Sequence, residues 1–159
     1  MSERHLATAD FEALAEEILI NGNSFRFQAT GSSMRPFILN GDVVQIEPLA
    51  PASFKRGTII FCRLSPNRLA VHRIVRVKEQ VNEKLLLIQG DAMLQPDGWI
   101  PARQVIGVVS TVMRGSQVIR QDSPSNRAMS WLWIRAEPVR PVLLILVGAF
   151  WKFLKLFTV

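Results

Sequence analysis

Short apolar runs between residues 24 and 120, separated by turn-forming residues, constrain the fold more than any other feature. The runs carry either the apolar–polar alternation or the short, β-branched character that is typical of strands. They cover residues 24–30, 43–46, 58–64, 69–77, 84–89, 105–113 and 116–120. Gly, Pro, Asn and Asp separate them, and Arg114-Gly115 favours a hairpin between the last pair. We therefore predict a mainly β fold with a partly closed sheet.

The two ends of the chain differ from this central region. Residues 8–21 have apolar side chains at helical spacing and end at Asn21-Gly22, which predicts a short amphipathic helix. Residues 142–151 form an uncharged apolar run beyond Pro138 and Pro141. We thus divide the chain into an N-terminal helix (1–24), a β-rich domain (25–121), and a linker with an apolar, helical C-terminal tail (122–159).

The apolar tail predicts contact with a membrane. Residues 142–151 are too few for a spanning helix, which needs about 20 residues, and Lys152 and Lys155 follow them. Trp131 and Trp133 would suit a helix lying in the membrane interface. Packing of the tail on the domain or on another protomer is the alternative. Basic residues lie on both sides of the run, so the side of the membrane stays open, and a cytoplasmic protein is the other expected location.

Composition narrows the classes of function. The chain has 159 residues, of which 48% are hydrophobic and 20% charged, so it can form a packed core. Its net charge of +6 is scattered without a Lys/Arg block, and we expect no nucleic-acid partner. Cys62 is the only cysteine, so the chain has no intrachain disulfide, and no Cys/His cluster has metal-ligand spacing. We expect neither a metal nor another cofactor. Residues 1–17 lack the apolar run of a secretory signal.

A serine and a histidine carry the chemistry of this sequence. Ser33 lies in the turn-like segment Gly31-Ser32-Ser33-Met34-Arg35-Pro36, and His72 lies in a strand-like run. A serine hydroxyl is a weak nucleophile without a base, and a histidine with its ordinary pKa near 6.5 is mostly neutral at pH 7. The protonated imidazole would then need a carboxylate, for which Asp91 and Asp97 are the candidates.

These motifs, taken together and in this order, resemble the signal peptidase I superfamily, which includes the self-cleaving LexA-type repressors. The resemblance covers roughly residues 25–112 and rests on the following segments: residues 31–36, Gly41-Asp42, residues 71–75, and Gly90-Asp91 with Asp97. It implies a coiled, partly closed antiparallel sheet. It also implies a serine endopeptidase that cuts an extended leader or signal segment, with small side chains beside the cut, in a peptide or protein precursor.

The residue at position 72 assigns the chain to one branch of that superfamily. Most bacterial signal peptidases and the repressors use a lysine base, whereas the endoplasmic-reticulum and archaeal enzymes use a histidine followed by aspartates. His72, directly before Arg73, occupies the position at which the lysine branch has its lysine. The resemblance therefore implies Ser33 as nucleophile and His72 as general base. Asp97 is favoured over Asp91 as the residue that orients the histidine, because Asp91 follows a glycine in a turn.

The resemblance also implies the surroundings of the nucleophile. Gly31 stands where many signal peptidases have a serine that donates to the oxyanion, so the backbone N–H groups at Ser33 and its neighbours would serve instead, with Ser32 a weaker donor. Met34 and Pro36 are expected in the substrate pocket.

Two other functions stay open at this point. A non-catalytic peptide-binding or scaffold module could keep the same fold and capture an extended chain at a sheet edge. A self-cleaving regulator is disfavoured, because residues 1–24 are too few for a DNA-binding domain and the lysine base is absent.

Overall fold

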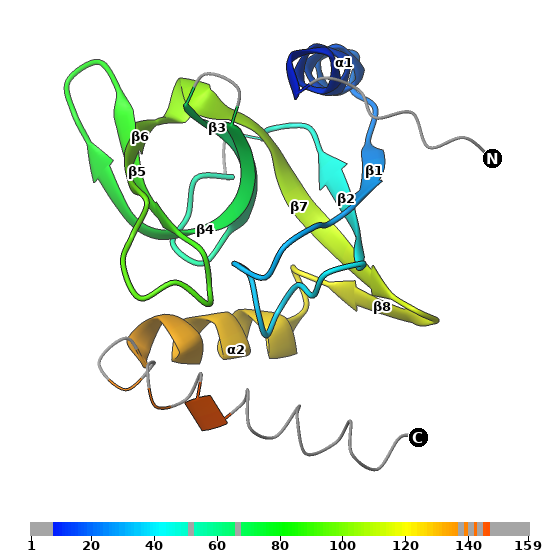
Figure 1. The fold of residues 1–159 in the computed structure, drawn as a ribbon. Coiled ribbons are helices and arrows are strands. Elements are labelled where there is room, and N and C mark those ends of the chain that lie inside the picture. Colours follow the sequence, from blue (N-terminus) through cyan, green and yellow to red (C-terminus); the bar gives the residue numbers. More distant parts are fainter. Residues whose placement is uncertain are drawn as a thin grey trace.

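The structure is a computed structural model that describes residues 8–50, 53–65, 68–136, 139, 142 and 145–146. A curled antiparallel sheet forms its centre, one helix covers an end of the sheet, and a second helix runs beneath it (Figure 1). The elements are α1 (Thr8–Ile20), β1 (Phe25–Gln28), β2 (Val43–Glu47), β3 (Ile59–Ser65), β4 (Arg68–Glu79), β5 (Lys84–Gln89), β6 (Gly98–Pro101), a 3₁₀ turn (Ala102–Gln104), β7 (Val105–Arg114), β8 (Gln117–Arg120) and α2 (Pro124–Arg135).

The strand order is β1-β2-β7-β3-β4-β5-β6, with β8 paired to β7 as a hairpin. Neighbouring strands are antiparallel, and the long strand β4 bends so that it pairs with β3 along its first half and with β5 along its second. Register shifts in several pairs add to this curl, because a bulge bends its strand and increases the local twist. The predicted mainly β fold, with its partly closed antiparallel sheet and short N-terminal helix, is confirmed.

Buried apolar side chains form two clusters. The first fills the space between α1 and the strands β1, β2, β3 and β7, and it includes Met34 and Ile38 from the segment after β1. The second lies within the curl of β3, β4, β5 and β6, and it includes Cys62 and Ile74. The loop that carries Ser33 is therefore held by the first cluster, because two of its side chains are part of that core.

Helix α1 packs on the sheet through one apolar face, as its spacing predicts. Ala15 and Leu19 are buried, and Phe11 makes edge-to-face contacts with Phe25, Phe27 and Phe61. On its polar side, Glu12 and Glu16 form ion pairs with Arg63 of β3. The helix ends where Gly22 adopts a positive φ of 78°, which favours glycine.

Two elements differ from the sequence-based expectation. Strand β6 was not predicted, because it has only four residues, begins with Gly98 and ends with Pro101, and is too short to show an alternating pattern. Helix α2 begins at Pro124, inside the polar segment 121–127, for which the sequence indicates a loop. Ser123 caps it by accepting from the backbone N–H of Asn126, and Pro124 takes a first-turn position where its missing N–H costs nothing.

The prediction of an apolar C-terminal helix is not supported by α2. This helix buries Ser130 and Ile134, and it carries Asn126, Arg127 and Arg135 among its apolar residues. Most of the predicted apolar run 142–151 and all of residues 147–159 lie outside the described residues. Within the part of the chain that is described, no helix combines the length and the apolar character needed to cross a bilayer.

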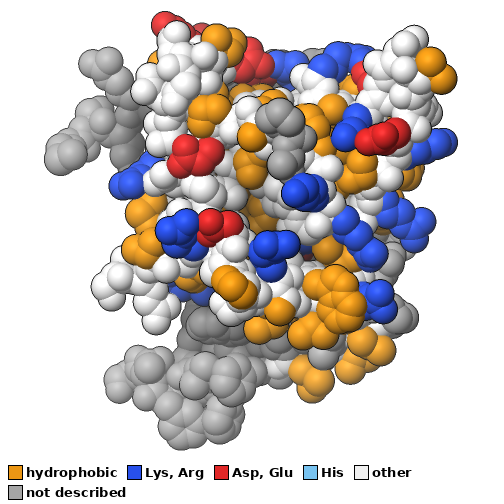
Figure 2. All heavy atoms as spheres, turned by 180° about the vertical axis from the view of Figure 1, so that it is seen from behind, with side chains coloured by type: hydrophobic (Ala, Val, Ile, Leu, Met, Phe, Trp, Pro, Cys, Tyr) orange, Lys and Arg blue, Asp and Glu red, His pale blue; other side chains and the backbone are white. Residues whose placement is uncertain are grey.

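On the face drawn in Figure 2, basic side chains are spread out rather than gathered in one stripe. Figure 2 shows Lys and Arg at several separate places on one face, among acidic and apolar side chains.

Candidate active site

Ser33 lies in a loop of residues 29–42, the Ser33 loop, which connects β1 to β2. Backbone hydrogen bonds close its base, from the Ala29 N–H to the Asp42 carbonyl at 2.7 Å and from the Gly41 N–H to the Ala29 carbonyl at 2.8 Å. Gly31 has a φ of 91°, and its N–H donates to Oδ1 of Asn40 at 3.0 Å. A positive φ at this position favours glycine, since a Cβ would strain the backbone.

A buried carboxylate fixes the far side of the same loop. Asp42 is 4% exposed; it accepts from the Leu39 N–H at 2.8 Å and from Nε and Nη2 of Arg114 in β7 at 3.0 and 2.8 Å. The same guanidinium donates to the Phe37 carbonyl at 3.1 Å. The sequence gives no local signal for this pair, because Arg114 is distant along the chain.

Strand β4 places His72 next to Ser33. Nε2 of His72 lies 3.1 Å from Oγ of Ser33, which is within hydrogen-bond reach. Nδ1 on the other side of the ring lies 2.7 Å from Oδ2 of Asp97, and the two side chains are only 4% and 12% exposed. The Nδ1–H does not point straight at the carboxylate, so this close contact is bent. Misaligned contacts of this kind are common in unliganded sites. Ser33, His72 and Asp97 thus form one continuous series.

The surroundings of His72 favour its neutral form. Burial lowers the pKa of His72 below its ordinary value, the nearby Asp97 carboxylate opposes this by attraction, and Arg68 adds to the lowering. The result is an imidazole that stays unprotonated at neutral pH and can accept a proton from Ser33.

Asp91 occupies a different position from Asp97. Its two carboxylate oxygens accept from Nε and Nη2 of Arg73, both at 2.7 Å, and these side chains are 3% and 1% exposed. This fork-to-fork geometry is the strong form of an arginine–carboxylate pair. Of the two predicted candidates, Asp97 therefore lies against the histidine ring, and Asp91 is engaged by the neighbouring arginine.

The turn after β5 contacts Ser33 directly. The Ala92 N–H donates to the Ser33 carbonyl at 2.8 Å. Gly90 lies so close that a Cβ there would stand 2.7 Å from the Ser33 carbonyl oxygen and 3.1 Å from its Cβ. The side chain of Gln89 stabilises this turn by donating a hydrogen bond from Nε2 to the Met93 carbonyl at 2.7 Å. Gly90 is therefore required for close approach, a role that the Gly-Asp pair in the sequence did not reveal.

A cleft of about 470 Å³ opens beside Ser33, His72 and Asp97. Its walls are mostly apolar and come from Phe11, Phe27, Ala29, Met34, Ile38, Leu39, Phe61, Leu69, Ala70, Val71 and Met93, with Thr30, Gly31 and Arg68. Of the two residues predicted for the substrate pocket, Met34 lines the cleft although it is largely buried in the core. Pro36 and Ser32 are not among the described residues that line it.

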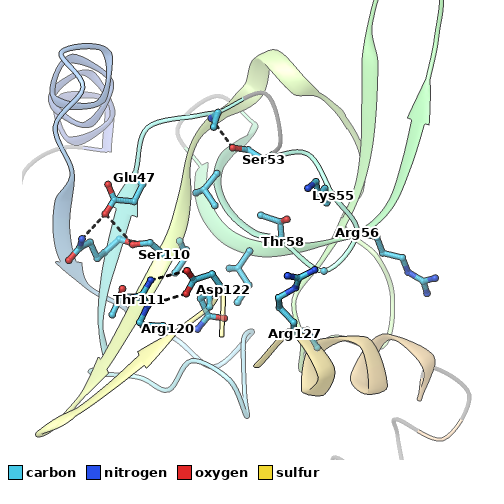
Figure 3. A pocket seen from close by; sticks show the side chains of 18 of the residues that line it. Glu47, Ser53, Lys55, Arg56, Thr58, Ser110, Thr111, Arg120, Asp122 and Arg127 are labelled. Carbon is cyan, nitrogen blue, oxygen red and sulfur yellow. Dashed lines mark hydrogen bonds and ion pairs between the residues drawn. The ribbon is translucent and has the colours of Figure 1, made fainter. Parts of the chain in front are cut away.

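A larger pocket of about 1390 Å³ lies elsewhere, between the segment 53–58, strands β2 and β7, and helix α2 (Figure 3). Gln45 and Glu47 face it, whereas the alternate residues Val44 and Ile46 face the core. Lys55, Arg56 and Arg127 lie around it, and Arg120 is paired with Asp122. Within the described ranges this pocket shares no lining residue with the cleft at Ser33.

The described residues include no group of three His, Cys, Asp or Glu side chains that could hold a metal ion. Comparison with models of known protein families and with curated proteins gives no match for this chain.

Proposed function

We propose that this protein is a serine endopeptidase in which Ser33 is the nucleophile, His72 the general base and Asp97 the residue that orients the histidine. The observation that carries the proposal is the unbroken series from Oγ of Ser33 to Nε2 of His72 at 3.1 Å and from Nδ1 to Asp97 at 2.7 Å. A nucleophile within reach of a base that is oriented by a third group is the signature of activated serine catalysis.

The reaction follows from this geometry. Oγ of Ser33 attacks the carbonyl carbon of the scissile peptide bond while its proton passes to Nε2 of His72. Asp97 stabilises the imidazolium that forms, and the imidazolium then gives its proton to the leaving amine as the C–N bond breaks. A water molecule, deprotonated by the neutral His72, attacks the resulting ester. The imidazolium then returns this proton to Oγ of Ser33 as the ester bond breaks, and the acid product is released.

Backbone N–H groups near the nucleophile supply the donors for the oxyanion. Among the described residues, the N–H groups of Ser33 and Met34 donate to no acceptor, and both residues line the cleft. Such donors stabilise the charge that develops on the carbonyl oxygen in the transition state. The Ser32 hydroxyl is a further, weaker candidate.

The substrate is an extended segment of a precursor peptide or protein. Residues 68–72 of β4 pair with β3 on one side, whereas β5 pairs with β4 only from Arg73 onward. Among the described residues, no strand pairs with the other edge of this half-strand, so an extended chain could pair with it there. The resemblance to signal peptidases adds that the side chains beside the cut are small.

We also propose that the chain belongs to the histidine branch of the signal peptidase and LexA-like superfamily, as the sequence resemblance implies. No lysine is among the described residues that line the cleft, and the histidine occupies the position of the base. Contact with a membrane through the apolar run 142–151 remains a prediction, because most of that run lies outside the described residues.

The proposal is tested with Ser33→Ala and His72→Ala in the full chain. We expect each variant to lower kcat/KM on an extended peptide substrate by about 10⁴-fold or more, with an unchanged circular dichroism spectrum. A fluorophosphonate probe, which labels activated serines, should label the wild type and not Ser33→Ala. Ser116→Ala, in the exposed turn between β7 and β8, is the matched control and should be labelled. Normal cleavage by both variants would refute the proposal. Peptide binding without cleavage or labelling would instead favour a non-catalytic binding module.

A further inference from the structure

The buried guanidinium of Arg73 joins helix α2 to the active site. Besides its two hydrogen bonds to Asp91, Arg73 donates through Nη1 to Oγ of Ser130 in α2 and to the Gly57 carbonyl, both at 2.8 Å. Ser130 is itself 7% exposed. Because a buried charge needs its hydrogen bonds satisfied, Ser130 is part of what holds Arg73, and through it Asp91, in place.

Trp133, one turn further along α2, makes two more contacts toward the same region. Its Nε1–H donates to the backbone carbonyl of Asp91 at 3.1 Å. Its ring meets Phe37 edge to face, with ring centroids 5.6 Å apart. Phe37 belongs to the Ser33 loop, and the guanidinium of Arg73 lies over its ring at 4.6 Å. Helix α2 therefore contacts both the turn after β5 and the loop that carries the nucleophile.

The last connection runs from that turn to Ser33. Ala92, directly after Asp91, donates to the Ser33 carbonyl, and Gly90, directly before it, packs against Ser33 without room for a side chain. His72, by contrast, sits in a paired strand opposite Ile60. The position of Ser33 relative to His72 thus depends on the turn and the loop that α2 holds.

We propose that Ser130 and Trp133 are positioning residues, and that docking of α2 sets the distance between the Ser33 hydroxyl and the His72 imidazole. The proposal rests on the proposed serine-peptidase function. Neither residue lines the cleft at Ser33. Their loss should therefore lower kcat with little change in KM, because displacement of a reacting group by about 1 Å can cost about 100-fold in rate.

The test uses Trp133→Phe, which keeps the aromatic contact and removes the N–H donor, and Ser130→Ala, which removes the acceptor for Arg73. Ser130→Thr, which keeps a hydroxyl, is the conservative rescue. Ser125→Ala and Trp131→Phe are the controls, because both side chains lie on the exposed face of the same helix. The measurements are the rate of fluorophosphonate labelling, kcat and KM on a peptide, and hydrogen exchange at residues 31–42 and 89–93.

We expect Trp133→Phe and Ser130→Ala to slow labelling and kcat by about 10- to 100-fold at nearly constant KM, with faster exchange in the two segments. Ser130→Thr and both controls should resemble the wild type. Labelling, kcat and exchange at wild-type levels in Trp133→Phe would overturn the proposal, as would a rise in KM that accounts for the whole loss. If the wild type itself is not labelled, the proposed function fails, and unchanged hydrogen exchange would then separately overturn the role of α2.

Discussion

At the scale of single residues, two aspartates that are similar candidates in the sequence have different surroundings in the structure. Asp97 lies against the imidazole of His72, and Asp91 is buried on Arg73. The sequence could place Ser33, His72 and both aspartates as candidates, because they belong to short motifs. It could not reveal the partners Arg73–Ser130 or Asp42–Arg114, since each joins residues far apart along the chain and no local pattern marks them.

The two aspartates should therefore respond differently to loss of charge. Asp97→Asn should lower kcat/KM by about 10³- to 10⁴-fold, because the amide leaves the imidazolium unstabilised and can favour the wrong tautomer. Its urea unfolding midpoint should change little. Asp91→Asn should instead destabilise the fold by about 3–5 kcal/mol, because it leaves the guanidinium of Arg73 buried without its counter-charge. Kinetics and urea unfolding on both variants measure this contrast. Equal loss of stability in the two variants would contradict it.

The pH dependence should follow the lowered pKa of His72. Catalysis needs the neutral imidazole, so the acidic limb of kcat/KM should have its midpoint below the ordinary value of about 6.5. In the unfolded chain this histidine takes up its proton near pH 6.5, but in the folded protein only at lower pH. The free energy of unfolding should therefore fall as the pH drops below about 6.5.

The control for the pH dependence of the free energy of unfolding is the variant His72→Gln, whose side chain does not titrate. The loss of unfolding free energy between pH 7 and pH 5 should be smaller in His72→Gln than in the wild type. A kcat/KM profile with its acidic midpoint above 7 would argue against a neutral buried base.

At the scale of elements, strands with clear alternation were predictable, and those decided by long-range pairing were not. Strand β6 forms because Trp99 and Ile100 pair with Leu87 and Leu86 of β5. Its own four-residue sequence is too short to predict a strand. Helix α2 was partly missed because Ser123 and Pro124 resemble a loop in isolation, although they also form a helix start. Helix α1 was found because its apolar spacing is regular.

The packing of α1 on β7 depends on a glycine. A Cβ at Gly107 would lie 2.4 Å from Cγ2 of Ile46, 2.9 Å from the Glu47 carbonyl and 3.0 Å from Cδ1 of Leu19. Gly107→Ala should therefore destabilise the protein by about 1–3 kcal/mol through overpacking. The urea unfolding midpoint measures this effect, and Val118→Ala in the neighbouring strand β8, where the side chain is exposed, is the control. A midpoint as high as that of the wild type would show that α1 does not pack as described.

At the scale of the whole molecule, the curl of the sheet was predictable, but its strand order was not. The order depends on β7, which pairs with β2, β3 and β8. Strands β2 and β3 come much earlier in the sequence than β7, so these pairings join distant parts of the chain. Such pairings are fixed by burial of both apolar clusters together rather than by local sequence. The short motifs around Ser33, His72 and Asp97 were therefore sufficient to predict a candidate site, although they could not predict the strand order that brings these residues together.

Cys62 should report unfolding of the whole domain. It is fully buried in the second apolar cluster, and burial raises the pKa of its thiol to about 12. A thiol of this kind is inert, because the reactive thiolate does not form at ordinary pH. In the native protein at pH 8, a disulfide reagent should leave it unmodified, and it should become reactive in urea in parallel with loss of circular dichroism. Fast modification without denaturant would contradict the described core.

The position of α2 has a consequence for dissecting the protein into fragments. A fragment ending at residue 121 would retain His72 and strand β4, yet lose Trp133 and Ser130, which contact Asp91 and Arg73. The first helix is equally hard to omit, because Phe11 forms part of the cleft wall. The smallest fragment that keeps Ser33, His72, Asp97 and the elements that contact them therefore runs from α1 through residue 135, beyond the strands on both sides.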